Sequence, residues 1–451
     1  MMKKSARLLQ ICFLLFVILS LVSCSNTSTS NNDIAIFMQA FDKHSPKPYS
    51  GTLLVYQSDE ILFHQSFGYA DVNNNDEITN NHLFPIGSIT KTITATAIMI
   101  LQEQGMIDLE DSINDVLEVD DFDESLRIKH LLSHTTQFSR DGLFKGLSSV
   151  STQEHFDYLL NVSKNKKATQ TLNYSNANYI LLAIILEKIT NQPYEQVIQE
   201  VIFDPLNMNH SYVVMDEKML DNQVKGYQLY DNDASELTMY NLSNVLGSGN
   251  IIMSSEDLLT FIVSFKEKTL LSASSIQQMM TKQACNEIEC YGYGWFVSPS
   301  NNLRVYHGGH INNSGYVSYV EVDQNKDTIV ILLTNNEDMT AYEVVRQSVV
   351  ALLDDQETVV LQKESKQNYS SNDIEAIVGK YSINQDVIIE VKVNDNVFYA
   401  SAEDGKYYEL IMLEENKFAY KEVPWVTLTF NDDTCIIQNI ATVFEAQKVD
   451  E

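Results

Sequence analysis

The segment of residues 88–104 constrains the fold more than any other part of the chain, once its secondary structure is decided. Its pattern fits either a strand or a helix. Four threonines and a near alternation of apolar and polar residues favour a strand. However, the segment has no glycine or proline and is much longer than an ordinary strand of about 4–8 residues. Apolar residues also recur at helical spacing, and Gly105 follows where a helix would end. We therefore predict a helix that begins at Ser88.

The choice between strand and helix decides which side chains Ser88 meets. Lys91 would point away from Ser88 on a strand, whereas the two residues share one face of a helix. A serine hydroxyl is a weak nucleophile until a neighbouring group removes its proton, and a lysine can do so when burial lowers its pKa. Alternatively, Ser88 caps the helix and Lys91 is a surface residue. The Ser-x-x-Lys motif alone does not separate these interpretations, since it also occurs by chance.

Two further polar motifs suit a reaction site. The tripeptide Tyr174-Ser-Asn176 precedes a strongly apolar segment, where its tyrosine could transfer protons and its amide could hold a substrate carbonyl. The tetrapeptide His307-Gly-Gly-His310 precedes a predicted strand, and its glycines would let a substrate backbone lie close to a strand edge. Together with Ser88 and Lys91, these motifs favour a catalytic site over a capping serine and a surface lysine.

The three motifs resemble the serine β-lactamase and penicillin-binding protein superfamily in order and rough spacing. The middle motif begins with a tyrosine, and in this it resembles the branch that contains class C β-lactamases, D-Ala-D-Ala carboxypeptidases and related esterases. Connecting segments agree as well, namely residues 128–135, 203–208 and 247–249. The resemblance covers residues 34–353. It implies an α+β fold of the β-lactamase and transpeptidase type, with an antiparallel sheet flanked by helices and a helical region beside it.

The resemblance also implies roles for the residues of the motifs. Ser88 would attack a carbonyl carbon, while Lys91 and Tyr174 would handle the proton. Asn176 would position the substrate. The backbone N–H groups of Ser88 and His310 would form the oxyanion hole, where the loss of one donor typically costs about 10²–10³ in rate.

The third motif departs from the superfamily pattern. His307 stands where the pattern K-T-G has its lysine, and no hydroxyl lies between His307 and Gly309. Both residues would still bind substrate. We expect His307 to change charge near its ordinary pKa of about 6.5, which would contribute to a bell-shaped pH profile. Without the hydroxyl, we expect slow β-lactam turnover at best, with acylation easier to detect than hydrolysis.

The motifs and the resemblance together imply a serine hydrolase that works through an acyl-enzyme on Ser88. The expected substrates are D-Ala-D-Ala-type peptides, amides or esters of cell-wall origin, with β-lactams as possible ligands. The alternative is a protein of the same fold that binds penicillin or peptides, or confers immunity, with little or no turnover. No cofactor is expected. His130 and His134 have metal-ligand spacing, but no third ligand is visible, so packing and capping roles are favoured over a metal site.

The N-terminus predicts export and anchoring. Three basic residues precede a mostly apolar run at residues 8–22, which is typical of a secretory signal. The run ends at Leu21-Val-Ser-Cys24, which resembles the lipobox of bacterial lipoproteins and implies lipidation of Cys24. An uncleaved signal anchor is the alternative. We expect a signal peptide at residues 1–23, a tether at 24–33, and a protein anchored on the extracellular face of the bacterial membrane.

The charge of the chain and its cysteines limit the possible partners. The signal segment holds three of the 30 basic residues and none of the 61 acidic ones, so the remainder has a formal charge near −34. Such a surface makes nucleic acid a poor partner. Cys285 and Cys290 could close a small loop by a disulfide, or they and Cys435 could be unpaired thiols.

The chain divides into two predicted domains. Residues 34–353 would form the hydrolase domain, in which we expect a hairpin from residues 51–56 and 60–69, a helix at 178–190, and strands at 315–322 and 328–334. Residues 354–372 are acidic and polar, and we expect a linker there. Residues 373–451 contain short strands at close spacing, which predict a small antiparallel sheet or barrel with a structural or recognition role.

Overall fold

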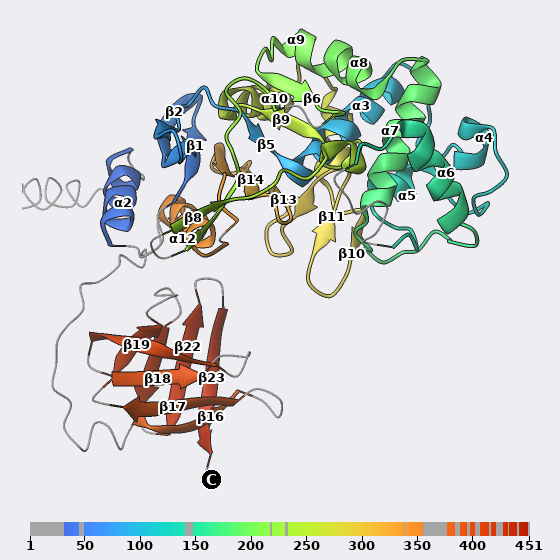
Figure 1. Cartoon of the computed structure of the whole chain (residues 1–451). Coiled ribbons are helices and arrows are strands. Elements are labelled where there is room, and N and C mark those ends of the chain that lie inside the picture. The colour runs from blue at the N-terminus through green and yellow to red at the C-terminus, as the bar shows by residue number, and fades with distance from the viewer. Residues whose placement is uncertain are drawn as a thin grey trace, which may run out of the picture.

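The structure is a computed structural model of the whole chain (Figure 1). It describes residues 31–44, 49–139, 148–216, 219–230, 233–337 and 339–354, and residues 377–449 except for 384–387, 395–396, 402–405, 415, 421–426, 432 and 440–441. The predicted signal peptide, Cys24 and nearly all of the predicted linker lie outside the described residues. Within that described part, no helix is both long enough and apolar enough to cross a bilayer.

An eight-stranded antiparallel sheet forms the centre of the N-terminal part, in the order β10-β11-β12-β13-β14-β15-β1-β2. Its strands are β1 (Gly51–Gln57), β2 (Glu60–Phe67), β10 (Ala284–Cys285), β11 (Cys290–Tyr291), β12 (Phe296–Val297), β13 (Arg304–Ile311), β14 (Tyr316–Asp323) and β15 (Thr328–Thr334). The predicted hairpin β1–β2 and the predicted strands β14 and β15 are confirmed.

Different helices cover the two faces of this sheet. Leu53 and Leu54 of β1 point to opposite faces and belong to different apolar clusters, as alternation along a strand requires. The cluster with Leu53 is closed by α2 (Asn31–His44) and α12 (Met339–Leu353). The cluster with Leu54 is larger and extends into the helical region, where it places the 3-10 turn η1 (Gly87–Ile89) and α10 against the sheet.

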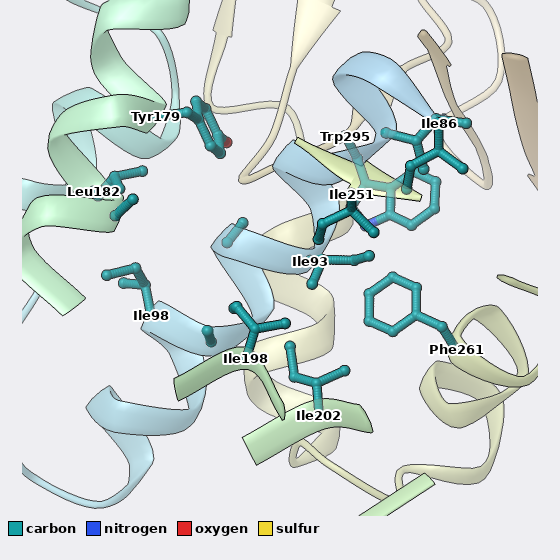
Figure 2. Close-up of a cluster of buried hydrophobic side chains, with 14 of the residues drawn as sticks. Ile86, Ile93, Ile98, Tyr179, Leu182, Ile198, Ile202, Ile251, Phe261 and Trp295 are labelled. Atoms are coloured by element: carbon teal, nitrogen blue, oxygen red, sulfur yellow. The ribbon is translucent and has the colours of Figure 1, made fainter. Parts of the chain in front are cut away.

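The disputed segment forms a helix, as predicted. A short 3-10 turn, η1 (Gly87–Ile89), leads into α3 (Thr90–Glu103), and every residue of α3 up to Leu101 is buried. Thr92 and Thr96 donate their hydroxyl protons to backbone carbonyls one turn earlier, at 2.8 and 2.7 Å. These bonds satisfy the polar groups of the buried threonines, so burial overrides their low helix propensity. Figure 2 shows α3 residues Ile93 and Ile98 among aliphatic and aromatic neighbours from other elements.

The helical region packs around α3 and α7 (Asn176–Thr190) (Figure 1). The remaining helices are α4 (Ile113–Leu117), α5 (Ile128–Leu132), α6 (Thr152–Val162), α8 (Tyr194–Ile198), η2 (Gln199–Phe203), α9 (Asp204–Leu206), η3 (Leu242–Val245), α10 (Ser255–Glu267) and α11 (Ala273–Met280). Short strands complete this part: β3 (Tyr69–Asp71), β4 (Asp76–Glu77), β5 (Phe84–Pro85), β6 (Ser211–Val213), β7 (Tyr227–Tyr230), β8 (Asp233–Glu236) and β9 (Ile251–Met253). The strand β5 pairs with β9 and leads directly to η1, so it fixes where α3 begins.

The C-terminal residues form a closed antiparallel barrel of eight strands, which confirms the predicted β-rich domain. The strands are β16 (Gly379–Ser382), β17 (Ile388–Asn394), β18 (Val397–Ser401), β19 (Tyr407–Glu414), β20 (Lys417–Tyr420), β21 (Thr427–Asn431), β22 (Thr434–Asn439) and β23 (Thr442–Val449). Pairing of β16 with β23 closes the barrel. Its interior holds aromatic and aliphatic side chains that include Phe398, Phe418 and Phe430.

Candidate active site

Ser88 lies in η1, where the sheet meets the helical region. Gly87 before it has a φ of 51°, and a Cβ atom built there would lie only 3.0 Å from the backbone nitrogen of His310. A glycine is therefore required for the turn and for its close approach to β13. The backbone nitrogens of Ser88 and His310 consequently lie on two segments in direct contact, which is the arrangement an oxyanion hole needs.

Lys91 lies one turn after Ser88 and is completely buried, so the surface-lysine interpretation is wrong. Its Nζ atom donates to Ser88 Oγ at 3.0 Å, to Asn176 Oδ1 at 2.8 Å and to the Ser248 carbonyl at 2.8 Å. These acceptors come from three segments that are far apart in sequence. The three bonds give a buried lysine the polar partners it needs, and they fix its amine beside the Ser88 hydroxyl.

Tyr174 reaches the same place from the loop before α7. Ser175 Oγ accepts a hydrogen bond from the Ala177 backbone N–H at 3.2 Å, which caps the helix. Asn176, expected in the loop, is in fact the first residue of α7. The Tyr174 ring stacks on Phe296 and has its centroid 4.9 Å from Lys91 Nζ. The structure therefore brings all residues of the first two motifs together.

His307 is buried and neutral, so the expectation that it changes charge near pH 6.5 is wrong. Its Nδ1–H donates to the Gly308 carbonyl at 2.8 Å, and its Nε2 accepts from the Tyr291 hydroxyl at 3.1 Å. Burial, and next the nearby Lys91, lower the pKa of His307 to about 3. Burial also raises the pKa of Tyr291 well above its ordinary value, so its hydroxyl remains a donor.

The third motif lies within β13 and not before a strand, which corrects the sequence prediction. The neighbouring strand β12 pairs only with Val305 and Tyr306, so in the described sheet the edge from His307 to Ile311 has no partner on that side. An extended substrate could add to this open edge. Glycines are depleted in strands, so Gly308 and Gly309 hid the strand in the sequence.

The two glycines of β13 differ in their surroundings. A Cβ atom built on Gly309 would lie 2.1 Å from the Ile86 carbonyl oxygen and 2.3 Å from Ser318 Oγ. One built on Gly308 would have its nearest neighbour at 3.8 Å. Gly309 therefore lets the segment that carries Ser88 pack directly on the strand. This role was not foreseen from the sequence, which assigned Gly309 to substrate binding.

A carboxylate braces the end of β13. His310 Nε2 lies 3.1 Å from Glu337 Oε1, and the backbone N–H of Asn313 donates to the same oxygen at 2.5 Å. The His310 side chain is exposed, whereas the Glu337 side chain is largely buried. The brace joins the strand that supplies the oxyanion-hole nitrogen to the segment after β15.

His130 and His134 serve capping and packing, as favoured from the sequence. His130 Nδ1 accepts from the Arg127 backbone N–H at 3.0 Å and caps α5. His134 is buried below Tyr174, with ring centroids 4.3 Å apart. Among the described residues, no group of three or more His, Cys, Asp or Glu side chains is arranged to hold a metal ion.

Cys285 and Cys290 form a disulfide, which settles the pairing that the sequence left open. The bridge joins β10 to β11 beside the active site, and the Cys285 carbonyl accepts from the Leu172 backbone N–H at 3.2 Å. It therefore supports the loop that carries Tyr174. Cys435 is a free, buried thiol inside the barrel, and burial raises its pKa to about 12.

Sequence reasoning missed two groups of the site. The Ser248 carbonyl was not predicted to bind Lys91, although residues 247–249 had been recognised as a connecting segment of the superfamily. Tyr291 was not among the predicted site residues, but it is buried in β11 and its hydroxyl fixes His307. Both groups lie far from their partners in sequence, so local patterns could not connect them.

Comparisons with known proteins agree with this geometry. A family model described as Beta-lactamase matches residues 45–354. A penicillin-binding protein of Bacillus subtilis (strain 168) is 29% identical over 332 residues, which cover 68% of this chain and 72% of the relative. The teichoic acid D-alanine hydrolase of Staphylococcus aureus (strain MRSA252) is 25% identical over 294 residues, which cover 64% and 70%.

A solved structure supports the fold over both parts of the chain. The octameric penicillin-binding protein homologue from Pyrococcus abyssi aligns with a TM-score of 0.65 at 23% sequence identity. The alignment covers 92% of this chain and 98% of the homologue. A likeness of this extent includes much of the C-terminal barrel as well as the sheet and the helical region.

Proposed function

This chain belongs to the β-lactamase family, and we propose that it is a surface-anchored serine hydrolase that cleaves D-alanyl peptides, amides or esters through an acyl-enzyme on Ser88. The observation that carries this proposal is the buried Lys91, whose Nζ lies 3.0 Å from Ser88 Oγ next to Tyr174 and Asn176. A serine that only capped a helix would not need a buried amine bound to its hydroxyl.

The proposed reaction has two steps. In acylation, Ser88 Oγ attacks the substrate carbonyl carbon while its proton passes to the Lys91 and Tyr174 pair. The carbonyl oxygen becomes negative and is stabilised by the backbone N–H groups of Ser88 and His310. The bond to the leaving amine or alcohol then breaks, and the leaving group takes the proton. In deacylation, water attacks the acyl ester, returns its proton to Ser88 Oγ by way of the same pair, and releases the acid.

The surroundings of β13 favour esters and amides of D-alanine over β-lactams and peptides that end in a carboxylate. His307 is neutral and Gly308 has no hydroxyl, so neither supplies the charge or the donor that K-T-G would offer to a carboxylate. The relative from Staphylococcus aureus, by its name, acts on D-alanine of teichoic acid. We therefore propose D-alanyl esters of the cell envelope as the first substrates to examine.

Labelling and turnover test the proposal together. The purified chain is incubated with a fluorophosphonate probe, and hydrolysis is measured with a D-alanyl ester, a D-alanyl-D-alanine peptide and a penicillin. We expect one adduct on Ser88, turnover of the ester, and slow deacylation of the penicillin. Ser88→Ala should lose label and turnover, whereas Ser300→Ala, which changes an exposed serine, should keep both. Labelling without turnover of any substrate would favour the binding protein of the same fold, and labelling that survives in Ser88→Ala would refute the nucleophile.

We also propose that Cys24 carries the lipid anchor. One acyl chain holds a protein only marginally, so stable attachment requires at least two. The full chain should partition into the detergent phase, and Cys24→Ala should alter its processing or release it. Identical processing and partitioning of both forms would contradict the lipobox and favour an uncleaved anchor.

A further inference from the structure

His134 has an unusual backbone conformation just past Ser133, the C-cap of α5. Its φ is 55°, in the left-handed region that residues other than glycine rarely adopt. Such a conformation persists only where the surrounding structure enforces it. Its carbonyl accepts from the Asn173 backbone N–H at 2.8 Å, so the residue is tied to the segment just before Tyr174.

The His134 ring is tied to the segment just after Tyr174. Its Nδ1 accepts from the Ser175 backbone N–H at 3.2 Å and lies 2.9 Å from Asn178 Nδ2. Thr136 Oγ1 donates to Asn178 Oδ1 at 2.8 Å, which leaves the amide NH₂ of Asn178 to donate to His134. With two donors directed at Nδ1, that atom is unprotonated, and the ring proton is on Nε2.

The Nε2–H group of His134 has no hydrogen-bond partner although it is buried. Three tyrosine rings surround the imidazole, with centroids 4.3 Å away for Tyr174, 4.7 Å for Tyr291 and 5.0 Å for Tyr179. An N–H group can donate weakly to an aromatic face, which explains how this polar atom is tolerated there. Burial, and next Lys91, lower the pKa of His134 well below its ordinary value, so the ring adds no second positive charge beside Lys91.

We infer that His134 is a positioning residue for Tyr174, which it holds through backbone bonds on both sides and through a ring packed against the phenol. The inference rests on the proposed function in one respect, namely that Tyr174 transfers protons during the reaction. His134 does not touch the reacting atoms. Its effect is to keep the tyrosine in the one orientation that serves the leaving group.

The leaving group of the substrate provides the readout, which is the loss of kcat for an amide compared with the loss for an ester. A purely structural role would not change the ratio of these two losses. An amide needs its nitrogen protonated before it departs, whereas a p-nitrophenyl ester has a good leaving group that does not. A displaced Tyr174 should therefore impair the amide more than the ester. Loss of folded protein, in contrast, lowers both activities by the same factor.

Three variants of the full chain test the inference. His134→Phe keeps an aromatic ring but loses the acceptor. Its kcat should fall by about 10²-fold for D-alanine amide but only by about tenfold for the p-nitrophenyl ester, with little change in KM. His134→Asn tolerates a positive φ and keeps an acceptor, so it should recover much of the loss. The control is His82→Phe, because His82 Nδ1 also accepts a backbone N–H, from Thr79 at 2.9 Å, outside the site. It should lower the unfolding temperature and leave kcat unchanged.

Nitrogen NMR of the wild-type imidazoles gives an independent check, and it should show His134 as the neutral tautomer with its proton on Nε2. Equal losses for amide and ester in His134→Phe, or kcat values like those of His82→Phe, would overturn the positioning role while leaving the proposed function intact. A wild-type chain with no turnover dependent on Ser88 would overturn both.

Discussion

Replacing Gly309 by alanine should displace the catalytic segment from β13. The new Cβ atom would lie 2.1 Å from the Ile86 carbonyl oxygen, whereas ordinary contacts begin near 3.4 Å, so the two segments must separate by about 1.3 Å. Ser318 blocks a simple adjustment, because its hydroxyl donates to that carbonyl at 2.7 Å. Overpacking of this kind costs about 1–3 kcal/mol of stability. A displacement of about 1 Å between Ser88 and the oxyanion-hole strand should lower kcat/KM about 10²-fold.

Gly308→Ala is the matched control for this prediction. It adds the same methyl group to the adjacent residue, but its nearest neighbour would be 3.8 Å away, in ordinary contact. The assay compares kcat/KM for a D-alanyl ester with the urea concentration at half-unfolding for the wild type and both variants. Gly308→Ala should keep the urea midpoint of the wild type, because its methyl group meets no packed segment. If Gly309→Ala matched Gly308→Ala in both measurements, the packing argument for Gly309 would be refuted.

Three further predictions address other parts of the site. The folded pKa of His307 is about 3 and the unfolded pKa is near 6.5, so the unfolded chain binds the extra proton between these values and stability falls as pH drops. Between about pH 6.5 and 5 the wild type should lose about 1–2 kcal/mol more stability than His307→Gln in urea unfolding, and equal losses would contradict a buried neutral imidazole. Replacing Cys285 and Cys290 together by serine should lower the free energy of unfolding by about 2 kcal/mol. It should also reduce kcat, because the bridge supports Leu172 near Tyr174, and an unchanged kcat would show that this support is dispensable. Lys91→Met should slow labelling of Ser88 by at least about 10²-fold, while its circular dichroism spectrum stays that of the folded wild type. Labelling at the wild-type rate would exclude Lys91 from the proton transfer.

Patterns within a segment predicted most of the elements around the site. The length of residues 88–104 and their freedom from glycine and proline were sufficient to predict α3 against the strand propensity of its threonines. The apolar run that became α7 was equally clear, apart from a start two residues earlier than expected. Such segments are long, and their burial pattern dominates any local preference.

Features that depend on distant neighbours were not predictable in the same way. Nothing in the sequence around His307 shows that Tyr291 fixes one ring nitrogen or that Lys91 lies close enough to lower its pKa. The pairing of β16 with β23, which closes the barrel, was also not predicted, since the sequence left a sheet and a barrel open as alternatives. β16 is short and begins with glycine, and β23 carries charged residues, so neither resembles an isolated strand; each is stabilised by pairing with the other.

The hydrogen bonds of His307 determine which groups are left to move protons. Its Nε2 accepts from Tyr291 and its Nδ1–H is bound to the Gly308 carbonyl, so neither ring nitrogen is available to Tyr174. His307 also remains neutral at any pH well above 3. In the proposed reaction this leaves Lys91 and Tyr174 as the pair that moves the proton, and Lys91 Nζ lies 4.9 Å from the Tyr174 ring centroid. The limbs of a bell-shaped pH profile then belong to that pair, and His307→Gln should leave their positions unchanged even if it lowers the rate.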